Sequence, residues 1–138
     1  MKLAVDSSAF AKRYVEEPGS DKLDFLLKDA AQLFFCVILV PEIISALSRR
    51  RREGILTAAD YQMVKAGLLE DVSDATVLQV TSRVVSHSVR LLEDNVLRSL
   101  DALHVAGAIE CRADLFATSD KQQFTAAKKA GLKVEFVG

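Results

Sequence analysis

Short apolar segments alternate with stretches whose apolar residues recur at helical spacing, and this alternation constrains the fold more than any other feature. The first apolar run, Leu3–Val5, ends in the polar turn Asp6-Ser7-Ser8. Apolar residues then recur at helical spacing from Phe10 to Val15, until Pro18-Gly19 interrupts them. The sequence therefore begins with a predicted strand, a polar turn and a predicted helix.

The longest apolar run, from Leu33 to Val40, predicts a strand that is buried on both faces. Pro41 follows at the first position of a predicted helix, whose inward residues are Ile43, Ile44 and Leu47. That helix is predicted to end in the basic run Arg49–Arg52, before Gly54. A buried strand followed by a helix is typical of a parallel sheet.

The same alternation continues to the end of the chain. Ser20-Asp21 and Ser99 are predicted helix caps, and a helix from Thr81 is predicted to turn Val84, Val85, Val89 and Leu92 inward. The remaining predicted elements are helices from Ser20, over Thr57–Glu70, Thr81–Glu93, Ser99–Glu110 and Lys121–Lys129, and strands over Ala75–Val80, Leu115–Ala117 and Val134–Val137.

Alternation with buried strands favours a parallel sheet, because parallel neighbours need crossover helices and those helices cover both faces. We therefore predict the α/β class, as a three-layer α/β/α sandwich around a mostly parallel five-stranded sheet. A length of 138 residues with 50% hydrophobic and 27% charged residues is typical of one globular domain spanning residues 1–138, and it excludes a disordered chain.

Charge and cysteine content narrow the class of protein further. The 18 basic and 19 acidic residues give a net charge of −1, which excludes a broad basic field that coats nucleic acid. Cys36 and Cys111 lie in apolar stretches and have no metal-ligand spacing, so they indicate a reducing compartment. Only three apolar residues separate Lys2 from Asp6, too few for a signal peptide. We expect a cytoplasmic protein with no membrane segment.

Acidic residues occupy four junctions between predicted strands and helices. Asp6 and Asp120 each follow a strand, whereas Glu42 and Asp101 each lie in the first turn of a helix. In open α/β sheets, ligands collect beyond the carboxyl ends of the strands, where helix N-termini point free N–H groups into a shared crevice. We expect the four carboxylates to converge there.

Each of these acids also has a structural explanation, because the helix dipole favours an acid in the first turn by ~0.3–1 kcal/mol and Asp is a common N-cap. Four converging carboxylates, however, repel one another unless a cation neutralises them. Hard oxygen ligands without a His or Cys cluster select Mg²⁺ or Mn²⁺. Such an ion activates water next to a phosphate, which indicates phosphoryl chemistry.

Other polar residues near these junctions have two interpretations each. The hydroxyls of Ser8 and Thr118 are candidates to support the metal ligands, and helix capping explains them equally well. His104 is interpreted as a packed or hydrogen-bonded core histidine and His87 as exposed. The basic run is a candidate RNA contact, or a solvated helix end that complements the dipole; its members are Arg49, Arg50, Arg51 and Arg52.

Four segments carry a resemblance to a known family over the whole chain. They are Leu3–Phe10 (LAVDSSAF), Val40–Leu47 (VPEIISAL), Leu100–Ala106 (LDALHVA) and Phe116–Asp120 (FATSD). In this order they resemble the PIN-domain ribonucleases, and in particular the VapC-type toxins of toxin–antitoxin pairs. The closing Ala126–Leu132 also resembles the usual end of that family.

The resemblance implies a function and a set of site residues. It implies that Asp6, Glu42, Asp101 and Asp120 are the acidic metal-binding quartet, that Thr118 and Asp120 form the TxD element, and that Ser8 supplies a supporting hydroxyl. It further implies cleavage of RNA by a Mg²⁺- or Mn²⁺-dependent endoribonuclease, a homodimer, and neutralisation by a cognate antitoxin. Ser7 replaces a residue that is often Thr in the family.

Three alternatives belong to other functional classes. A haloacid-dehalogenase-like phosphatase would need a second Asp two residues after the first, where Ser8 stands. A catalytically silent PIN-like module for protein interaction fits the fold but leaves the complete quartet unexplained. A phosphoacceptor receiver domain shares the length and the acidic pocket, but we would then expect paired acids after the first strand, where Asp6 is followed by two serines. Incubation with RNA and a divalent metal distinguishes the nuclease from the silent module and from the receiver domain.

Overall fold

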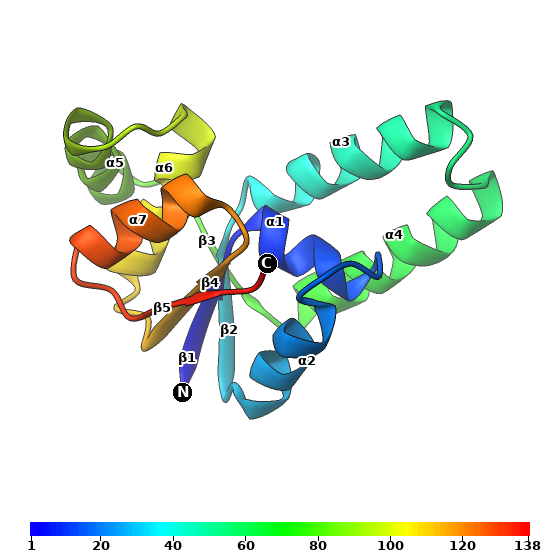
Figure 1. Ribbon diagram of the computed structural model, residues 1–138, viewed down its shortest axis with the longest axis horizontal. Helices are drawn as coiled ribbons and strands as arrows, with labels where there is room; N and C mark the ends of the chain where they lie inside the picture. The colour runs from blue at the N-terminus through cyan, green and yellow to red at the C-terminus, as the bar shows by residue number, and fades with distance from the viewer.

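Five parallel strands form one sheet in the computed structural model, which describes residues 1–138 (Figure 1). The spatial order is β3-β2-β1-β4-β5. The strands are β1 (Lys2–Val5), β2 (Gln32–Cys36), β3 (Thr76–Leu78), β4 (Leu115–Thr118) and β5 (Val134–Phe136). The helices are α1 (Ser7–Phe10), the 3₁₀ turn η1 (Ala11–Arg13), α2 (Ser20–Asp29), α3 (Leu39–Arg52), α4 (Ala58–Ser73), α5 (Ser82–Asp94), α6 (Ser99–Glu110) and α7 (Lys121–Lys129). The predicted α/β/α sandwich is confirmed, and its sheet is parallel throughout.

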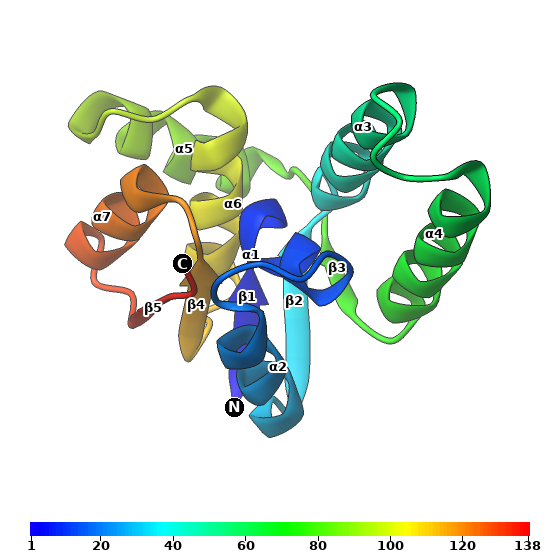
Figure 2. The same ribbon diagram turned by 45° about the vertical axis from the view of Figure 1, so that its right-hand side comes forward.

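Successive residues of each strand point to opposite faces of the sheet, so each face builds its own core. Leu3 and Val5 of β1 pack with α1 to α4, whereas Ala4 packs with α5, α6 and α7. In β2, Phe35 and Phe34 divide in the same way. Figure 2 shows α5 to α7 on one side of the strands and α3 and α4 on the other. Burial on both faces explains the uninterrupted apolar runs in the sequence.

The boundary between the second strand and the helix that follows differs from the prediction. The sequence predicts a strand over Leu33–Val40, but β2 ends at Cys36 and α3 begins at Leu39. Pro41 is therefore the third helical residue and not the first. This position is compatible with proline because N–H groups in the first helical turn have no partner within the helix. The edge strand β3 is likewise shorter than the predicted Ala75–Val80.

Helix α5 buries a different face from the one predicted. Val84 is buried as expected, but Val85, Val89 and Leu92 are exposed. The inward positions one and two turns further are Ser88 and Leu91. Ser88 is accommodated there because its hydroxyl donates to the carbonyl oxygen of Val85 at 2.7 Å. The prediction failed because a buried serine can be satisfied within its own helix.

Two predicted helix caps are also wrong. Arg98 occupies the N-cap of α6 in place of Ser99, and Gly19 precedes α2 in place of a Ser20 cap. Gly19 has a φ of +96°, and a Cβ there would lie 2.3 Å from the carbonyl oxygen of Val137. Glycine is required at that position because the turn packs directly on the chain end beyond β5.

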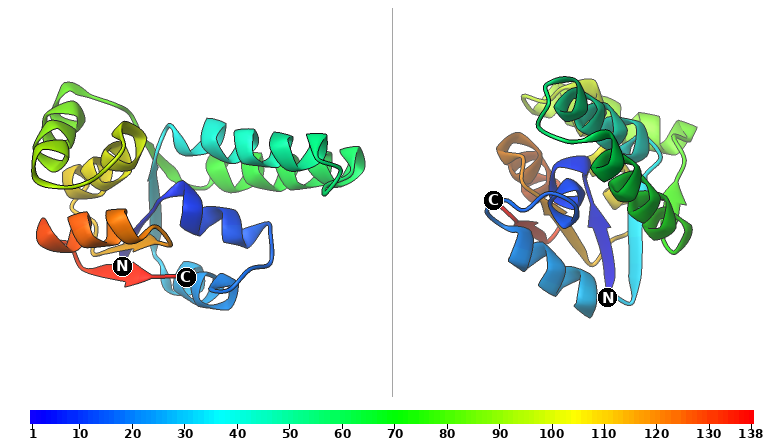
Figure 3. Two further views of the ribbon diagram at one scale, coloured as in Figure 1. Left: turned by 45° about the horizontal axis from the view of Figure 1, so that its top comes forward. Right: turned by 90° about the vertical axis from the view of Figure 1, so that its right-hand side faces the viewer.

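Helices α3 and α4 lie side by side as an arm that projects from the sheet (Figure 3). The turn between them contains Gly54 with a φ of +76°, and Thr57 caps α4 by accepting from the amide of Asp60. At the start of the chain, the helix predicted from Phe10 to Val15 is instead the short α1 followed by η1. No helix has the length and apolar character needed to cross a membrane.

Candidate active site

The four predicted acids line one cleft of about 250 Å³ at the carboxyl ends of the strands. The sheet order reverses between β1 and β4, where crevices of α/β folds bind ligands. Asp6 and Asp120 follow these two strands and cap α1 and α7. Glu42 and Asp101 enter the cleft from the first turns of α3 and α6. The convergence predicted from the sequence is therefore present.

Asp6 is the most buried of the four carboxylates, with no exposed surface. Its Oδ2 accepts from the hydroxyls of Ser8 at 2.6 Å and Thr118 at 2.8 Å, and its Oδ1 accepts from the amide of Ala9 at 2.9 Å. Burial raises the pKa of Asp6 above its ordinary value, and the charge of His104 and the three hydrogen bonds offset only part of that effect. The position thus carries a desolvation cost that a bound cation would relieve.

Residues of α1 and α6 bind only one of the two carboxylate oxygens of Glu42. Its Oε1 accepts from the Ser7 hydroxyl at 2.7 Å and contacts Nε2 of His104 at 2.5 Å. Partial burial raises the pKa of Glu42, but the hydrogen bonds from His104 and Ser7 outweigh it, so the pKa lies below its usual value. Oε2 has no hydrogen-bond partner in the protein, so Glu42 presents an ionised carboxylate with one oxygen free of protein contacts.

Asp101 is nearly buried and is contacted by one amide and one guanidinium. The side-chain amide of Gln123 donates to Oδ1 at 3.0 Å, and Nε of Arg98 lies 3.4 Å from Oδ2. The Arg98 side chain is 86% exposed, and among Lys and Arg residues it alone lines the cleft. Solvent screens this contact strongly. The negative charge of the cleft is therefore only partly balanced by the protein.

Asp120 combines helix capping with access to the cleft. Its Oδ1 accepts from the amides of Gln122 at 2.8 Å and Gln123 at 2.9 Å, while Oδ2 has no protein partner. Its own amide donates to the Thr118 hydroxyl at 3.0 Å. Thr118 therefore links Asp6 to Asp120 directly. Asp6 and Asp120 are therefore the helix caps, whereas the hydroxyls of Ser8 and Thr118 donate to Asp6 and cap no helix.

The residues lining the cleft fit a hard divalent cation. The available donors are carboxylate oxygens, at least two of which have no protein partner, and Mg²⁺ prefers such ligands. No three Asp, Glu, His or Cys side chains are close enough to coordinate one ion directly in this conformation. Mg²⁺ typically keeps several of its waters and binds one or two carboxylates, and a cleft of about 250 Å³ has room for those waters.

The arginines at the end of α3 lie in different environments. Arg49 lines a second hollow of about 520 Å³ that shares Glu42 and Ala46 with the acidic cleft. Arg51 instead stacks over the ring of Tyr61, with 5.4 Å between the guanidinium carbon and the ring centroid. Arg52 is exposed in the last turn and lines neither hollow. Arg49 is thus the member of the run that lies beside the acids.

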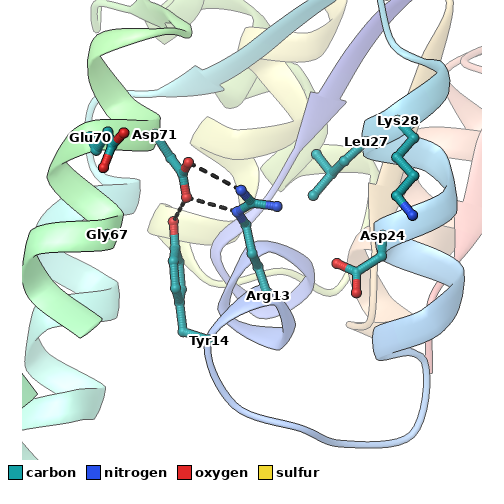
Figure 4. Close-up of a pocket in the computed structure, with 8 residues that line it drawn as sticks. All are labelled: Arg13, Tyr14, Asp24, Leu27, Lys28, Gly67, Glu70 and Asp71. Carbon is teal, nitrogen blue, oxygen red and sulfur yellow. Dashed lines mark hydrogen bonds and ion pairs between the residues drawn. The ribbon is translucent and has the colours of Figure 1, made fainter. Parts of the chain in front are cut away.

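A larger cavity of about 640 Å³ lies away from the acids, between η1, α2 and α4 (Figure 4). Arg13 and Tyr14 both point toward Asp71 on α4. Nε of Arg13 donates to Oδ2 at 2.7 Å, a second guanidinium nitrogen lies 3.3 Å from Oδ1, and the Tyr14 hydroxyl also donates to Oδ2. Burial and the bond to Asp71 raise the pKa of Tyr14. Asp71 is therefore fully engaged within the chain, whereas the other two carboxylates that line the cavity, Asp24 and Glu70, lie apart from this cluster.

Two cleft residues have roles that the sequence interpretation missed. His104 is a hydrogen-bonded core histidine as predicted, but its partner Glu42 was not foreseen. Gln123 was not singled out at all, because a glutamine in the first turn of a helix carries no signal. The prediction for His87 is wrong: this side chain is half-buried, and its Nε2 lies 2.8 Å from Oε2 of Glu110.

Comparisons with known proteins match nearly the whole chain. The family model described as PIN domain matches residues 3–129, a range that contains all four acids. Ribonuclease VapC46 of Mycobacterium tuberculosis is 33% identical over 132 residues, covering 94% of this chain and 93% of that protein. The structure of VapC20 of M. tuberculosis, described as a sarcin-ricin loop cleaving toxin, has a TM-score of 0.69 at 16% identity and covers 94% of this chain and 95% of that one. A chain in a toxin–antitoxin complex from Klebsiella pneumoniae has a TM-score of 0.69 at 15% identity, covering 100% and 98%.

Proposed function

Because the chain belongs to the PIN-domain family, we propose that it is a Mg²⁺- or Mn²⁺-dependent endoribonuclease and the toxin of a type II toxin–antitoxin pair. The convergence of Asp6, Glu42, Asp101 and Asp120 on one cleft carries the proposal. The relative VapC46 is named a ribonuclease, and the similar chain of VapC20 is described as a cleaving toxin, which supports RNA as the substrate. Residues 1–138 then act as one nuclease domain, and cellular RNA as the substrate implies a cytoplasmic site of action.

The four carboxylates would hold the ion, each prepared by its own partners. Ser8 and Thr118 orient Asp6, Ser7 and His104 orient Glu42, and both Glu42 and Asp120 keep an oxygen free of protein contacts. When bound, such an ion polarises phosphate oxygens and makes bound water nucleophilic near neutral pH. The free oxygens of Glu42 and Asp120 would orient a water in the cleft by accepting hydrogen bonds from it.

The first experiment is incubation of the protein with RNA in Mg²⁺, Mn²⁺ or EDTA, followed by mapping of the fragment ends. The proposal expects internal cuts with either metal and none in EDTA. Asp6→Asn and Asp101→Asn, which keep the side-chain shape, are expected to abolish both cleavage and growth inhibition. Full activity in EDTA or in either variant contradicts the proposal. A silent interaction module or a receiver domain would leave the RNA intact.

The hollow beside the cleft is a candidate path for the RNA backbone. It continues from Glu42 along α3 to Arg49, seven residues or about 10 Å further on the same helix face. A guanidinium at that distance can contact a phosphate that flanks the scissile one. Within the basic run, Arg49 would then contribute more to RNA binding than Arg50, Arg51 or Arg52.

Paired substitutions test this assignment on one helix. With a cleavage-inactive Asp101→Asn background, Arg49→Gln should weaken RNA binding and reduce the salt slope by about one unit, the effect of one lost phosphate contact. Arg52→Gln removes the same charge in the last turn but outside the hollow, so it should change both quantities less. Equal effects of the two variants would show that only the overall charge matters.

Two protein partners are also part of the proposal. The similar chain in the Klebsiella pneumoniae structure is part of a toxin–antitoxin complex, which supports a cognate antitoxin that covers the acidic cleft. Pairing of two copies is supported by the exposed apolar residues Val85 and Val89 of α5 and Val96, which precedes α6. Light scattering on the purified protein should give twice the 15.1 kDa chain mass, and a monomer at micromolar concentration would contradict the homodimer.

A further inference from the structure

Two buried side-chain polar atoms have no hydrogen-bond partner anywhere in the chain, and both belong to residues that line the acidic cleft. They are Nδ1 of His104 and Oε1 of Gln123. These side chains are nearly inaccessible, with His104 3% and Gln123 2% exposed. In each residue the other polar end donates to a carboxylate of the cleft.

We propose that His104 and Gln123 are positioning residues, which fix Glu42 and Asp101 in the orientation that binds the divalent metal. The inference rests on the proposed metal-dependent function of the cleft. Neither residue would touch the ion or the RNA. Each would act through the carboxylate that accepts its N–H.

The surroundings of His104 favour this role over simple packing. Its neighbours on α6 include Ala102, Val105, Ala106 and Ala108, which are all buried in the core beneath the sheet face. An apolar side chain would pack there without leaving a polar atom unpaired. Since a carboxylate only accepts, Nε2 carries the hydrogen that binds Glu42, and Nδ1 is left without a partner. The histidine is explained by its bond to Glu42.

The hydrogen bond between His104 and Glu42 also determines which oxygen of Glu42 remains without a protein partner. Ser7 and His104 both bind Oε1, and Ser7 Oγ lies 3.1 Å from Nε2 of His104, so the three groups form a closed cluster. Oε2 is thereby left without a protein partner at the cleft. Hydrogen bonds of this kind fix a ligand's rotamer before the metal arrives.

Gln123 joins two other carboxylates through different atoms. Its backbone amide donates to Asp120 Oδ1 at 2.9 Å, and its side-chain amide donates to Asp101 Oδ1 at 3.0 Å. One residue in the first turn of α7 therefore sets the distance between an acid that follows β4 and an acid on α6. A side chain of equal size without the amide would fill the space but lose this link.

Metal binding by the full chain tests the proposal without relying on activity. Calorimetric titration with Mn²⁺ compares the wild type with His104→Phe and Gln123→Met, which keep approximate size and remove the donor. His104→Gln restores an N–H at nearly the same place. The matched controls are His87→Phe, outside the cleft, and Gln122→Met, the adjacent exposed residue. Circular dichroism verifies that each variant is folded.

The expected result is a loss of Mn²⁺ affinity of about tenfold or more for His104→Phe and Gln123→Met, the range seen when hydrogen-bond partners of metal ligands are removed. His104→Gln should recover most of the loss, and both controls should match the wild type. Wild-type affinity in folded His104→Phe and Gln123→Met would overturn the inference, as would equal losses in His104→Phe and His104→Gln. Should His104→Phe fail to fold, Gln123→Met against Gln122→Met decides the outcome.

Cleavage of RNA is measured on the same samples so that the two proposals can fail separately. If the wild type binds Mn²⁺ and the variants bind it weakly, but RNA stays intact, the ribonuclease proposal fails and the positioning roles stand. If RNA is cut and the variants bind Mn²⁺ normally, only the positioning roles fail. A wild-type chain that binds no Mn²⁺ overturns both.

Discussion

The acidic cleft and the Asp71 cluster in the larger cavity beside α4 differ in how the negative charge of their carboxylates is compensated. In the cavity, Asp71 receives a guanidinium at 2.7 Å and a tyrosine hydroxyl, so its charge is compensated within the chain (Figure 4). In the cleft, Asp6 and Glu42 receive mostly neutral donors, and the only Lys or Arg that lines it is the exposed Arg98. A compensated carboxylate stabilises the fold, whereas uncompensated ones are suited to bind a cation.

The two regions also differ in what they connect. The Asp71 cluster ties η1, next to the start of the chain, to α4 in the projecting arm. The cleft draws its carboxylates from four separate strand and helix ends. Substitution of one carboxylate in each region should therefore affect different observables.

The largest expected difference is in RNA cleavage. Asp101→Asn should abolish detectable cleavage, a loss of at least about 10³-fold in rate, because stabilisation of charge by a bound metal is worth several kcal/mol. Asp71→Asn, the same chemical change in the larger cavity, should leave the rate at 25 °C nearly unchanged while the protein is folded. Single-turnover rates on a labelled RNA measure both. A comparable loss in Asp71→Asn would place that cavity in the active site and remove the distinction.

The free energy of unfolding should respond in the opposite way, with the larger loss for substitution of Asp71 in the cavity. Asp71→Ala removes the acceptor of two donors and leaves Arg13 and Tyr14 unpaired, so we expect a loss of about 2 kcal/mol in the free energy of unfolding. For a chain of this size that corresponds to roughly 6–8 °C in Tm. Urea unfolding of the metal-free protein, with Asp71→Asn as the milder variant, gives the measurement. An unchanged midpoint would mean that the cluster contributes little to the fold.

Asp6→Asn should increase the stability of the metal-free protein at pH 7, by about 1 kcal/mol, as is common when a functional residue with an unfavourable buried charge is replaced. The pKa of Asp6 is raised by burial, so its ionised form destabilises the native state above the folded pKa. Below the unfolded value of about 3.9, both states are protonated and the gain should vanish. Thermal unfolding of both proteins between pH 3 and pH 7 follows the difference, and a gain that persists at pH 3 would contradict this cause.

Glu42→Gln should change the stability of the metal-free protein in the opposite direction from Asp6→Asn. Its effect is expected to be the smallest of these predictions. The pKa of Glu42 is lowered, because its hydrogen bonds from His104 and Ser7 outweigh burial, so ionised Glu42 stabilises the native state. That contribution is complete above the unfolded pKa and is lost as the pH falls through the folded pKa. We expect Glu42→Gln to lower Tm slightly at pH 7 and to have no effect at the lowest pH. A Tm increase at pH 7 would mean that burial dominates at this residue too.

The placement of the four acids could be predicted from the sequence because topology alone determines it. Residues that directly follow parallel strands share one edge of the sheet, and first-turn residues of the crossover helices lie beside them. To place Asp6 and Asp120, it was enough to locate the ends of the preceding strands within a residue or two. The start of α3 was predicted wrongly, but Glu42 lies in the first helical turn with either start. The predicted placement of Glu42 is therefore correct.

The partners of the acids could not be predicted, because they depend on which helices pack together. His104 and Glu42 are 62 residues apart, and Gln123 and Asp101 are 22 apart. Nothing in the local pattern around His104 distinguishes a core histidine from one that binds a carboxylate on α3. The inward face of α5 failed for a related reason, since Val85 and Val89 are apolar yet exposed. Apolar character alone does not determine which face of a helix is buried.

The location of the metal tests the central claim most directly. Crystals of the wild-type protein grown with Mn²⁺ and measured at the manganese absorption edge will show an anomalous peak wherever the ion binds. We predict a peak in the cleft at about 2.1–2.2 Å from oxygens of at least one or two of the acids Asp6, Glu42, Asp101 and Asp120, with waters completing the shell. A cleft without a peak at saturating Mn²⁺, or a peak beside Asp71 in its place, would contradict the assignment of these carboxylates as the metal site.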